Sequence, residues 1–376
     1  MHVQEFDLDP DLIYLNHAAV APWPKVTVEA VSRFAQENGL SGALDYPKWM
    51  RTESALRARL ARLINAPSTD DIALLKSTSE GLSVVAHGLS WKAGDNLVSI
   101  AQEFPSNRIV WQSLEPKGVE VRLLDLAKHQ DPEEALIALC DDNTRLLAVS
   151  SVQYASGRRM QIERLGEFCR SRGIVFVVDA IQSLGALPFD IEKNHADAVV
   201  ADGHKWMLGP EGLALFYCRP QLRERLALRQ YGWHMVENAW DFEQTDWRPA
   251  DSARRFECGS PNMLGAHALL ASLDLLLEAG IDQVSARIEQ NTQAIIEQVE
   301  RRQFELLTPA QPQLRAGIIT FRVPEADTGS LQQGLMKAKV VSAERGGGIR
   351  FSPHYYNTQE QIEGAFTAID ELLRQA

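Results

Sequence analysis

Cysteine is scarce in this sequence, with four residues among 376, namely Cys140, Cys169, Cys218 and Cys258. They are scattered and show no metal-ligand spacing, so the sequence predicts neither a metal site nor a disulfide framework. Cys169 falls in a helical pattern and Cys218 in an apolar strand, where a free thiol serves as a small core side chain.

Long apolar runs and excess positive charge are also missing. No stretch approaches the roughly 20 apolar residues of a membrane span. Residues 1–10 lack the basic start and apolar run of a signal peptide. The formal net charge is -12, without the basic patch that nucleic-acid binders carry. We therefore expect no nucleic-acid partner, no membrane association and a cytoplasmic location.

The sequence does contain seven apolar runs that predict strands, with helical patterns such as 80–89 and 162–172 between the early ones. The runs are 72–76, 97–101, 119–124, 145–152, 174–179, 198–201 and 212–218. Alternating strands and helices predict a mostly parallel sheet covered on both faces. The last two runs are joined by a short loop without a helix, which permits an antiparallel strand.

After residue 261 the pattern changes to that of a smaller α/β domain. It predicts helices at 264–279, 282–302, 330–338 and 359–375, and strands at 317–323 and 349–352. We accordingly divide the chain into an N-terminal segment 1–16, a large domain 17–258 and a small C-terminal domain 259–376.

Lys205 is the most informative residue. It follows His204 and precedes Gly209-Pro210, between two apolar runs that are rich in β-branched side chains. Such neighbours desolvate the amine and lower its pKa. A neutral amine forms a Schiff base with a carbonyl compound. The alternative is an ordinary solvated surface lysine.

Two further segments carry candidate ligand groups. Asp179 ends an apolar strand, at the edge where α/β proteins bind ligands. It either caps the next helix or pairs with a protonated pyridine nitrogen. Residues 77–80, Ser-Thr-Ser-Glu, follow a strand and begin a helix. They fit a capping box and, equally well, an anion site at a helix start.

Arg350 follows the glycines 346–348 and enters an apolar strand with no acid nearby. Its planar guanidinium is a candidate clamp for a substrate carboxylate. The glycines match neither GxGxxG nor GxxxxGK[ST], so a nucleotide loop is not predicted.

These residues, in this order, resemble the class V aminotransferase family of fold type I pyridoxal-phosphate enzymes. That family includes cysteine desulfurases, selenocysteine lyases, kynureninases and isopenicillin N epimerase-like proteins. The resemblance covers nearly the whole chain, from residues 14–19 to 356–358. It implies a seven-stranded, mostly parallel sheet in the large domain, a small α/β domain, and the N-terminal segment at the cleft between them. The implied cofactor is pyridoxal 5'-phosphate.

The resemblance also implies roles for the residues around the cofactor ring. Lys205 holds the cofactor as an aldimine and then moves the proton between Cα and C4′. Asp179 keeps the ring nitrogen protonated, so that the ring accepts charge. Phe104 stacks on the ring. Gln182, placed one helical turn after Asp179, contacts the ring hydroxyl, while Tyr154 or its neighbour Gln153 faces the ring or the substrate.

For the phosphate, the resemblance implies Thr78, Ser79 and His204. Ser260 matches a position that reaches the neighbouring subunit's phosphate, which implies a homodimer with an active site shared across the interface. Asp202 departs from the serine of many desulfurases. Because an ionised carboxylate cannot donate to a phosphate, we expect it to pair with His204 or point away.

For the substrate, a small α-amino acid, the resemblance assigns the carboxylate to Arg350 and the entrance to Asn16 and His17. Desulfurases carry a thiolate nucleophile on a loop before the late arginine. No cysteine follows Cys258 in this sequence, so we argue against persulfide-forming desulfuration. The expected reaction is transamination or β-elimination of the selenocysteine or cystine lyase type. A kynureninase-like hydrolase, an amino-acid epimerase and a non-catalytic cofactor-binding regulator are the alternatives.

Overall fold

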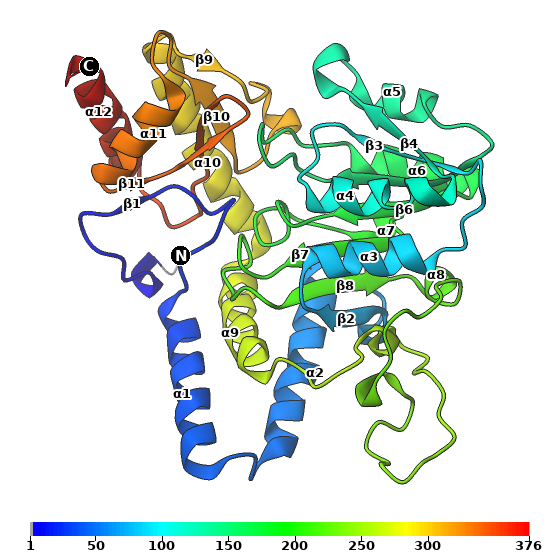
Figure 1. The fold of residues 1–376 in the computed structure, drawn as a ribbon. Helices are drawn as coiled ribbons and strands as arrows, with labels where there is room; N and C mark the ends of the chain where they lie inside the picture. Colours follow the sequence, from blue (N-terminus) through cyan, green and yellow to red (C-terminus); the bar gives the residue numbers. More distant parts are fainter. Residues whose placement is uncertain (1–2, 376) are drawn as a thin grey trace.

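The computed structural model describes residues 3–375, so residues 1, 2 and 376 of the predicted terminal segments lie outside it (Figure 1). A seven-stranded sheet has the order β2-β8-β7-β6-β5-β3-β4. Its strands are β2 (Ile72–Leu75), β3 (Asn96–Ile100), β4 (Glu120–Leu124), β5 (Thr144–Ser150), β6 (Val175–Asp179), β7 (Ala198–Asp202) and β8 (Ala214–Cys218). All seven predicted strands are confirmed. The last begins two residues later than predicted, because Gly212 has a positive φ of 81° and forms a turn.

The mostly parallel arrangement is also confirmed. β3 to β7 pair in parallel, whereas β8 runs antiparallel to both β7 and β2. The reversal follows from the short loop between β7 and β8, since a parallel return would require a long crossover.

Both faces of the large sheet are covered, which explains the continuous apolar runs. In β6, Val175 and Val177 pack toward α3 (Thr78–Gly88) and α4 (Ser106–Gln112), and Phe176 and Val178 pack toward α6 (Ile162–Arg172) and α9 (Met263–Ala279). Each fully buried valine or phenylalanine stabilises the fold by roughly 1.5–3 kcal/mol. The buried Cys169 and Cys218 belong to these two layers, and all four thiols are free.

A smaller antiparallel sheet has the order β12-β13-β10-β9. Its strands are β9 (Glu305–Leu306), β10 (Ile319–Arg322), β12 (Ala343–Arg345) and β13 (Gly348–Phe351). It packs with α10 (Ile281–Arg301), α11 (Thr328–Lys337) and α12 (Gln359–Gln375), so the predicted C-terminal elements are confirmed. Near the N-terminus, β1 (Ile13–Tyr14) pairs in parallel with β11 (Val340–Val341). The two predicted boundaries between the three parts of the chain stay predictions.

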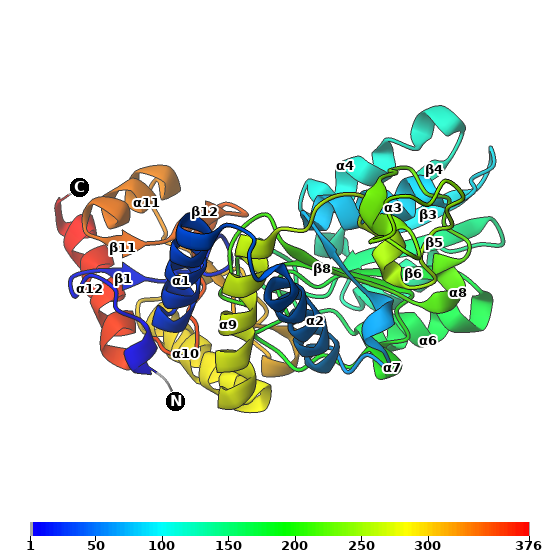
Figure 2. The ribbon, with the colours of Figure 1, turned by 90° about the horizontal axis from the view of Figure 1, so that it is seen from below.

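Two long helices that were not predicted, α1 (Lys25–Ser41) and α2 (Tyr46–Leu63), pack against α9 (Figure 2). The hydroxyl of Thr27 on α1 lies 2.6 Å from that of Ser272 on α9. Within residues 3–375 no single helix could cross a membrane, although α9 and α10 together, bent by 83°, meet the length and composition required.

Candidate active site

A cavity of about 280 Å³ lies at the carboxyl ends of the central parallel strands. The last residues of β5, β6 and β7, which are Ser150, Asp179 and Asp202, all line it. This is the edge at which open α/β sheets bind ligands. Eight predicted site residues line the cavity: Thr78, Phe104, Tyr154, Asp179, Gln182, His204, Lys205 and Arg350.

Lys205 lies on the loop between β7 and β8 with 8% of its surface exposed. Burial lowers the pKa of its amine to about 8, although the carboxylate of Asp179 opposes this shift. Its Nζ lies 5.6 Å from the centre of the Phe104 ring, and no ion pair to it is found in residues 3–375. Lys205 is therefore a desolvated amine with a substantial neutral fraction near pH 8.

Asp179 is nearly completely buried at the end of β6. Its Oδ1 accepts a hydrogen bond from the Ile181 N–H at 3.0 Å. Burial raises the pKa of Asp179 to about 7, and the negative charge of Glu103 adds to the increase. A buried carboxylate of this kind is completed by a cationic partner, such as a protonated ring nitrogen.

Glu103 was not identified from the sequence, yet it organises one wall of the site. Its Oε1 accepts hydrogen bonds from Ser150 N at 2.7 Å and from Gln153 Nε2 at 2.9 Å. The Ser150 hydroxyl donates to the other carboxylate oxygen of Glu103, Oε2. Gln153 is thereby turned toward Glu103, and Tyr154 is the neighbour that lines the cavity, with its ring 5.2 Å from that of Phe104. The sequence signal that could have identified it is its position, directly before Phe104 and shortly after a predicted strand.

The carboxylate of Asp202 lies at the start of α3, next to the predicted phosphate ligands. The Thr78 N–H donates to Asp202 Oδ2 at 2.9 Å, and the Asp202 N–H donates to Thr78 Oγ1 at 3.1 Å. Asp202 also lies 3.9 Å from His204 Nδ1. It therefore caps α3 in addition to facing His204, because helix starts attract negative charge.

Of the other predicted phosphate ligands, Ser79 lies beside the cavity and Ser260 lies away from it. The Ser79 hydroxyl is 2.8 Å from that of Ser106, which lines the cavity. Its backbone N–H has no partner among the described residues and remains available to an anion. Ser260 is exposed and does not line the cavity.

Gln182 lies in a turn, so its predicted place in a helix is wrong. The chain forms a turn instead, because the Asp179 carboxylate accepts the Ile181 N–H and Ala180 O accepts the Leu184 N–H. The Gln182 amide donates to Ala18 O at 3.0 Å and accepts from Trp206 Nε1 at 2.9 Å. It thereby links the N-terminal segment to the loop of Lys205.

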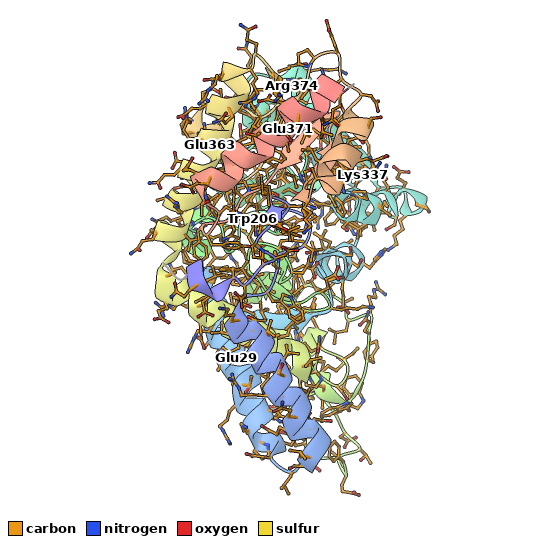
Figure 3. All side chains as sticks on the ribbon, turned by 90° about the vertical axis from the view of Figure 1, so that its left-hand side faces the viewer. Glu29, Trp206, Lys337, Glu363, Glu371 and Arg374 are labelled. Atoms are coloured by element: carbon orange, nitrogen blue, oxygen red, sulfur yellow. The ribbon has the colours of Figure 1, made fainter. Side chains whose placement is uncertain are left out.

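His17 is fully buried and does not line the cavity. Its Nδ1 lies 2.8 Å from Ser352 O, and its Nε2 lies 2.6 Å from the Tyr356 hydroxyl. Burial lowers its pKa, which keeps the ring neutral. The ring also contacts Trp206, which lies in the interior of the molecule (Figure 3). Through these two contacts, His17 joins the N-terminal part of the chain to its C-terminal part.

Arg350 lies on β13 and is almost fully buried. It donates to Tyr154 O at 2.8 Å and to Asn16 Oδ1 at 3.3 Å, while its Nε has no partner in the described chain. Burial lowers its pKa to about 10, and no acid pairs with it within residues 3–375. A buried guanidinium with an unused N–H fits a ligand carboxylate.

Comparison with known proteins identifies relatives along nearly the whole chain. The family profile "Aminotransferase class-V" matches residues 13–364. A probable cysteine desulfurase of Pyrococcus abyssi is 27% identical over 396 residues, covering 99% of this chain and 96% of the relative. A cysteine desulfurase of Salmonella newport is 30% identical over 325 residues, covering 83% of this chain and 78% of that protein.

Solved structures share the fold. The apo cysteine desulfurase of Thermococcus onnurineus has a TM-score of 0.88 at 24% identity and covers 99% of this chain and 97% of its own. A variant of C-DES in which a lysine is replaced by alanine, with glycine covalently linked to its PLP cofactor, has a TM-score of 0.91 at 22% identity. The match covers 98% of this chain and 99% of that chain. The expected fold type I architecture is thus confirmed.

The reaction predicted from the sequence is wrong. We argued against persulfide-forming desulfuration and expected transamination or β-elimination, but the relatives are cysteine desulfurases. The prediction required the sulfur acceptor to be a cysteine of the same chain, located after Cys258. Chemistry does not require this, because sulfur passes to any accessible thiolate.

The cofactor of this enzyme is pyridoxal 5'-phosphate, and the residues of the cavity fit it. Lys205 provides a neutral amine, Asp179 a buried carboxylate and Phe104 an aromatic face. The free N–H of Ser79 and the unpartnered Nδ1 of His204 fit a phosphate. From the profile match and this geometry together, the chain belongs to the class V aminotransferase family.

Proposed function

We propose that this enzyme is a cysteine desulfurase: it cleaves the C–S bond of cysteine and passes the sulfur to a thiol as a persulfide. Relatives with this activity in their names support the proposal. The observation that carries it is the unpaired, buried Arg350 guanidinium in the same small cavity as the Lys205 amine. Together they fit the carboxylate and the reacting end of one small α-amino acid.

Each residue has a role that follows from its chemistry. Pyridoxal phosphate, when bound, supplies an electron sink for negative charge at the substrate Cα. Lys205 is the base that takes and returns the proton at Cα, because its amine has a pKa of about 8. Asp179 holds positive charge at the far end of the cavity, and Arg350 orients the substrate carboxylate.

The sulfur acceptor comes from outside the four thiols of the chain. None of the four cysteines lines the cavity. Burial raises the pKa of Cys140 to about 11 and raises those of Cys169 and Cys218 further. With an external thiol RSH, cysteine and RSH give alanine and RSSH. The C–S bond breaks, an S–S bond forms, and the electron pair left on the substrate carbon takes a proton.

The test is product analysis by mass spectrometry with cofactor-loaded protein, cysteine and mercaptoethanol, followed by alkylation of the persulfide. We expect alanine and alkylated persulfide in equal amounts. A protein in which Cys140, Cys169, Cys218 and Cys258 are all replaced by serine or alanine is the control and should keep the rate. Pyruvate and ammonia without alanine would show that the proposed reaction is incorrect.

The proposed enzyme works as a homodimer. Tyr231, Trp240, Phe242 and Trp247 are exposed on one long loop, as is typical of a surface that a partner covers. Ser260 follows this loop in the sequence and is exposed, so its hydroxyl is open to a second subunit. Light scattering should give twice the mass of the chain. Mixing Lys205→Ala and Ser260→Ala proteins should then restore part of the activity, whereas no restoration would exclude a shared site.

A further inference from the structure

A second arginine, Arg345, lies on the same sheet face as Arg350. In the β12–β13 hairpin Ala343 pairs with Arg350, and Arg345 pairs with Gly348. Because side chains alternate along a strand, Ala343, Arg345 and Arg350 point to one face. Gly348 offers no side chain opposite Arg345, so the guanidinium is free to extend over the cavity that it lines.

The hairpin tip holds Arg345 in place. Gly346 and Gly347 have positive φ angles of 58° and 77°, as a tight two-residue hairpin turn requires. Arg322 Nε donates to Gly347 O at 3.1 Å. A side chain at Gly346 would meet Ala155 at 3.5 Å, so the tip rests on the loop that carries Tyr154. The hairpin tip beside Arg345 is therefore anchored both to Arg322 and to the loop of Tyr154.

Arg345 has no acidic partner among the described residues. Its one hydrogen bond runs from Nη1 to the backbone oxygen of Glu344 at 2.7 Å. Its charge contributes to the lowered pKa values of both Arg350 and Lys205. Glu211, an acid that also lines the cavity, acts on His204 at the opposite end. The two arginines thus leave the substrate end positively charged, which favours anions.

We infer that Arg345 binds a carboxylate of the thiol that accepts the sulfur. The inference rests on the proposed desulfuration. Cysteine brings one carboxylate, which Arg350 takes in the interior. Arg345 is exposed at the mouth, where a second molecule must enter to reach the substrate sulfur. The acceptor is thus a small thiol with an acidic group, and the arginine both attracts it and orients it.

The experiment compares three acceptors on the cofactor-loaded enzyme with saturating cysteine: mercaptopropionate, which carries a carboxylate, neutral mercaptoethanol and cationic cysteamine. The variant is Arg345→Gln, with Arg345→Lys as the conservative change. The control is Arg374→Gln, an exposed arginine at the outer end of α12 (Figure 3). For wild type we expect the highest kcat/KM with mercaptopropionate.

Arg345→Gln should lower kcat/KM for mercaptopropionate about fivefold, a size typical of exposed charge pairs. It should leave mercaptoethanol unchanged, and Arg345→Lys should retain part of the preference. An equal loss with all three acceptors, or a higher KM for cysteine itself, would mean that Arg345 binds the substrate and would overturn the inference. So would an unchanged preference for mercaptopropionate.

A binding measurement separates this inference from the proposed function. Methylthiopropionate has the carboxylate but no nucleophilic thiol, so calorimetry on the cofactor-loaded protein measures binding without turnover. Weaker binding to Arg345→Gln than to wild type and Arg374→Gln supports the carboxylate site. If no acceptor yields alanine, the proposed desulfuration fails, yet calorimetry still decides whether Arg345 binds a carboxylate, and equal binding to all three proteins overturns it.

Discussion

The two ends of the cavity differ in how their charges are paired. At the end that the large sheet forms, the Asp179 carboxylate interacts with the Lys205 amine, and Asp202 lies near both His204 and the start of α3. At the end formed by the small sheet, Arg350 and Arg345 face no acid in the described chain. The first end balances its charges before any ligand arrives, as suits a cofactor that stays. The second end leaves positive charge for molecules that come and go.

The largest expected effect comes from removing the amine at the balanced end. Lys205→Ala should lower alanine formation on the order of 10⁴-fold, because the proton at Cα loses its base. The measurement is product formation with cofactor added in excess. Circular dichroism should show an intact fold, and a variant that retains a tenth of the activity would remove Lys205 from its role.

Asp179→Asn tests the role of the negative charge at the large-sheet end of the cavity. We expect kcat to fall on the order of 10²-fold, since a neutral amide cannot hold a positive charge opposite it. Asp197→Asn is the matched control, because Asp197 is another acid at a strand end whose pKa burial raises, but it lies outside the cavity. Equal losses in the two variants would point to stability and not to catalysis.

At the unbalanced end, Arg350→Gln should act on binding. Losing one partner of a buried charge pair costs roughly 2–5 kcal/mol, so the KM for cysteine should rise at least about thirtyfold. Steady-state kinetics with mercaptoethanol as acceptor measures this. Arg374→Gln provides the surface control. A lower kcat at unchanged KM would contradict a binding role.

The two ends should be linked through the pKa of Lys205. Its value of about 8 lies below the ordinary value, so the neutral amine forms as pH rises through 8 and is lost below it. The rate at which apoprotein captures pyridoxal phosphate should therefore increase about tenfold from pH 7 to a plateau above pH 9. In Arg345→Gln the profile should shift to higher pH, because one cation that lowers this pKa is gone. An unshifted profile would show that the two ends are independent.

The smallest effect is expected at Asp202. Asp202→Asn keeps an acceptor for the Thr78 N–H and removes a negative charge beside the predicted phosphate position. Affinity for pyridoxal phosphate should increase by about threefold to fivefold, the size of a screened charge interaction. Fluorescence titration of the apoprotein measures it. Weaker cofactor binding would mean that the carboxylate itself is needed to order α3.

Local patterns were enough to predict the parts of the fold and site that depend on neighbouring residues. Apolar runs bounded by polar residues located all seven strands, and Asp179 and Lys205 were found because each follows such a run. What escaped depends on residues distant in sequence. Gln153 turns toward Glu103 across 50 residues. Arg345 was missed for a different reason: it lies near Arg350 in the sequence but shares its face only because of the hairpin register.

The turn of Gln182 illustrates the same limit. Its spacing from Asp179 fitted a helix, yet its amide bridges Ala18 and Trp206, which lie 164 and 24 residues away. Backbone conformation there follows from tertiary contacts that no local propensity encodes. The reaction was mispredicted for another reason: the position of one missing cysteine was used to judge chemistry that an outside thiol can perform.

The pairing of His17 with Tyr356 spans 339 residues and has a consequence for how the protein is made. During translation, Asp179 and Lys205 are synthesised well before Arg350, and synthesis of the residues between them takes on the order of ten seconds. A nascent chain at that stage holds the groups that retain the cofactor but lacks those that admit an amino acid. Substrate binding by Arg350 thus requires both ends of the chain, because Arg350 also donates a hydrogen bond to Asn16.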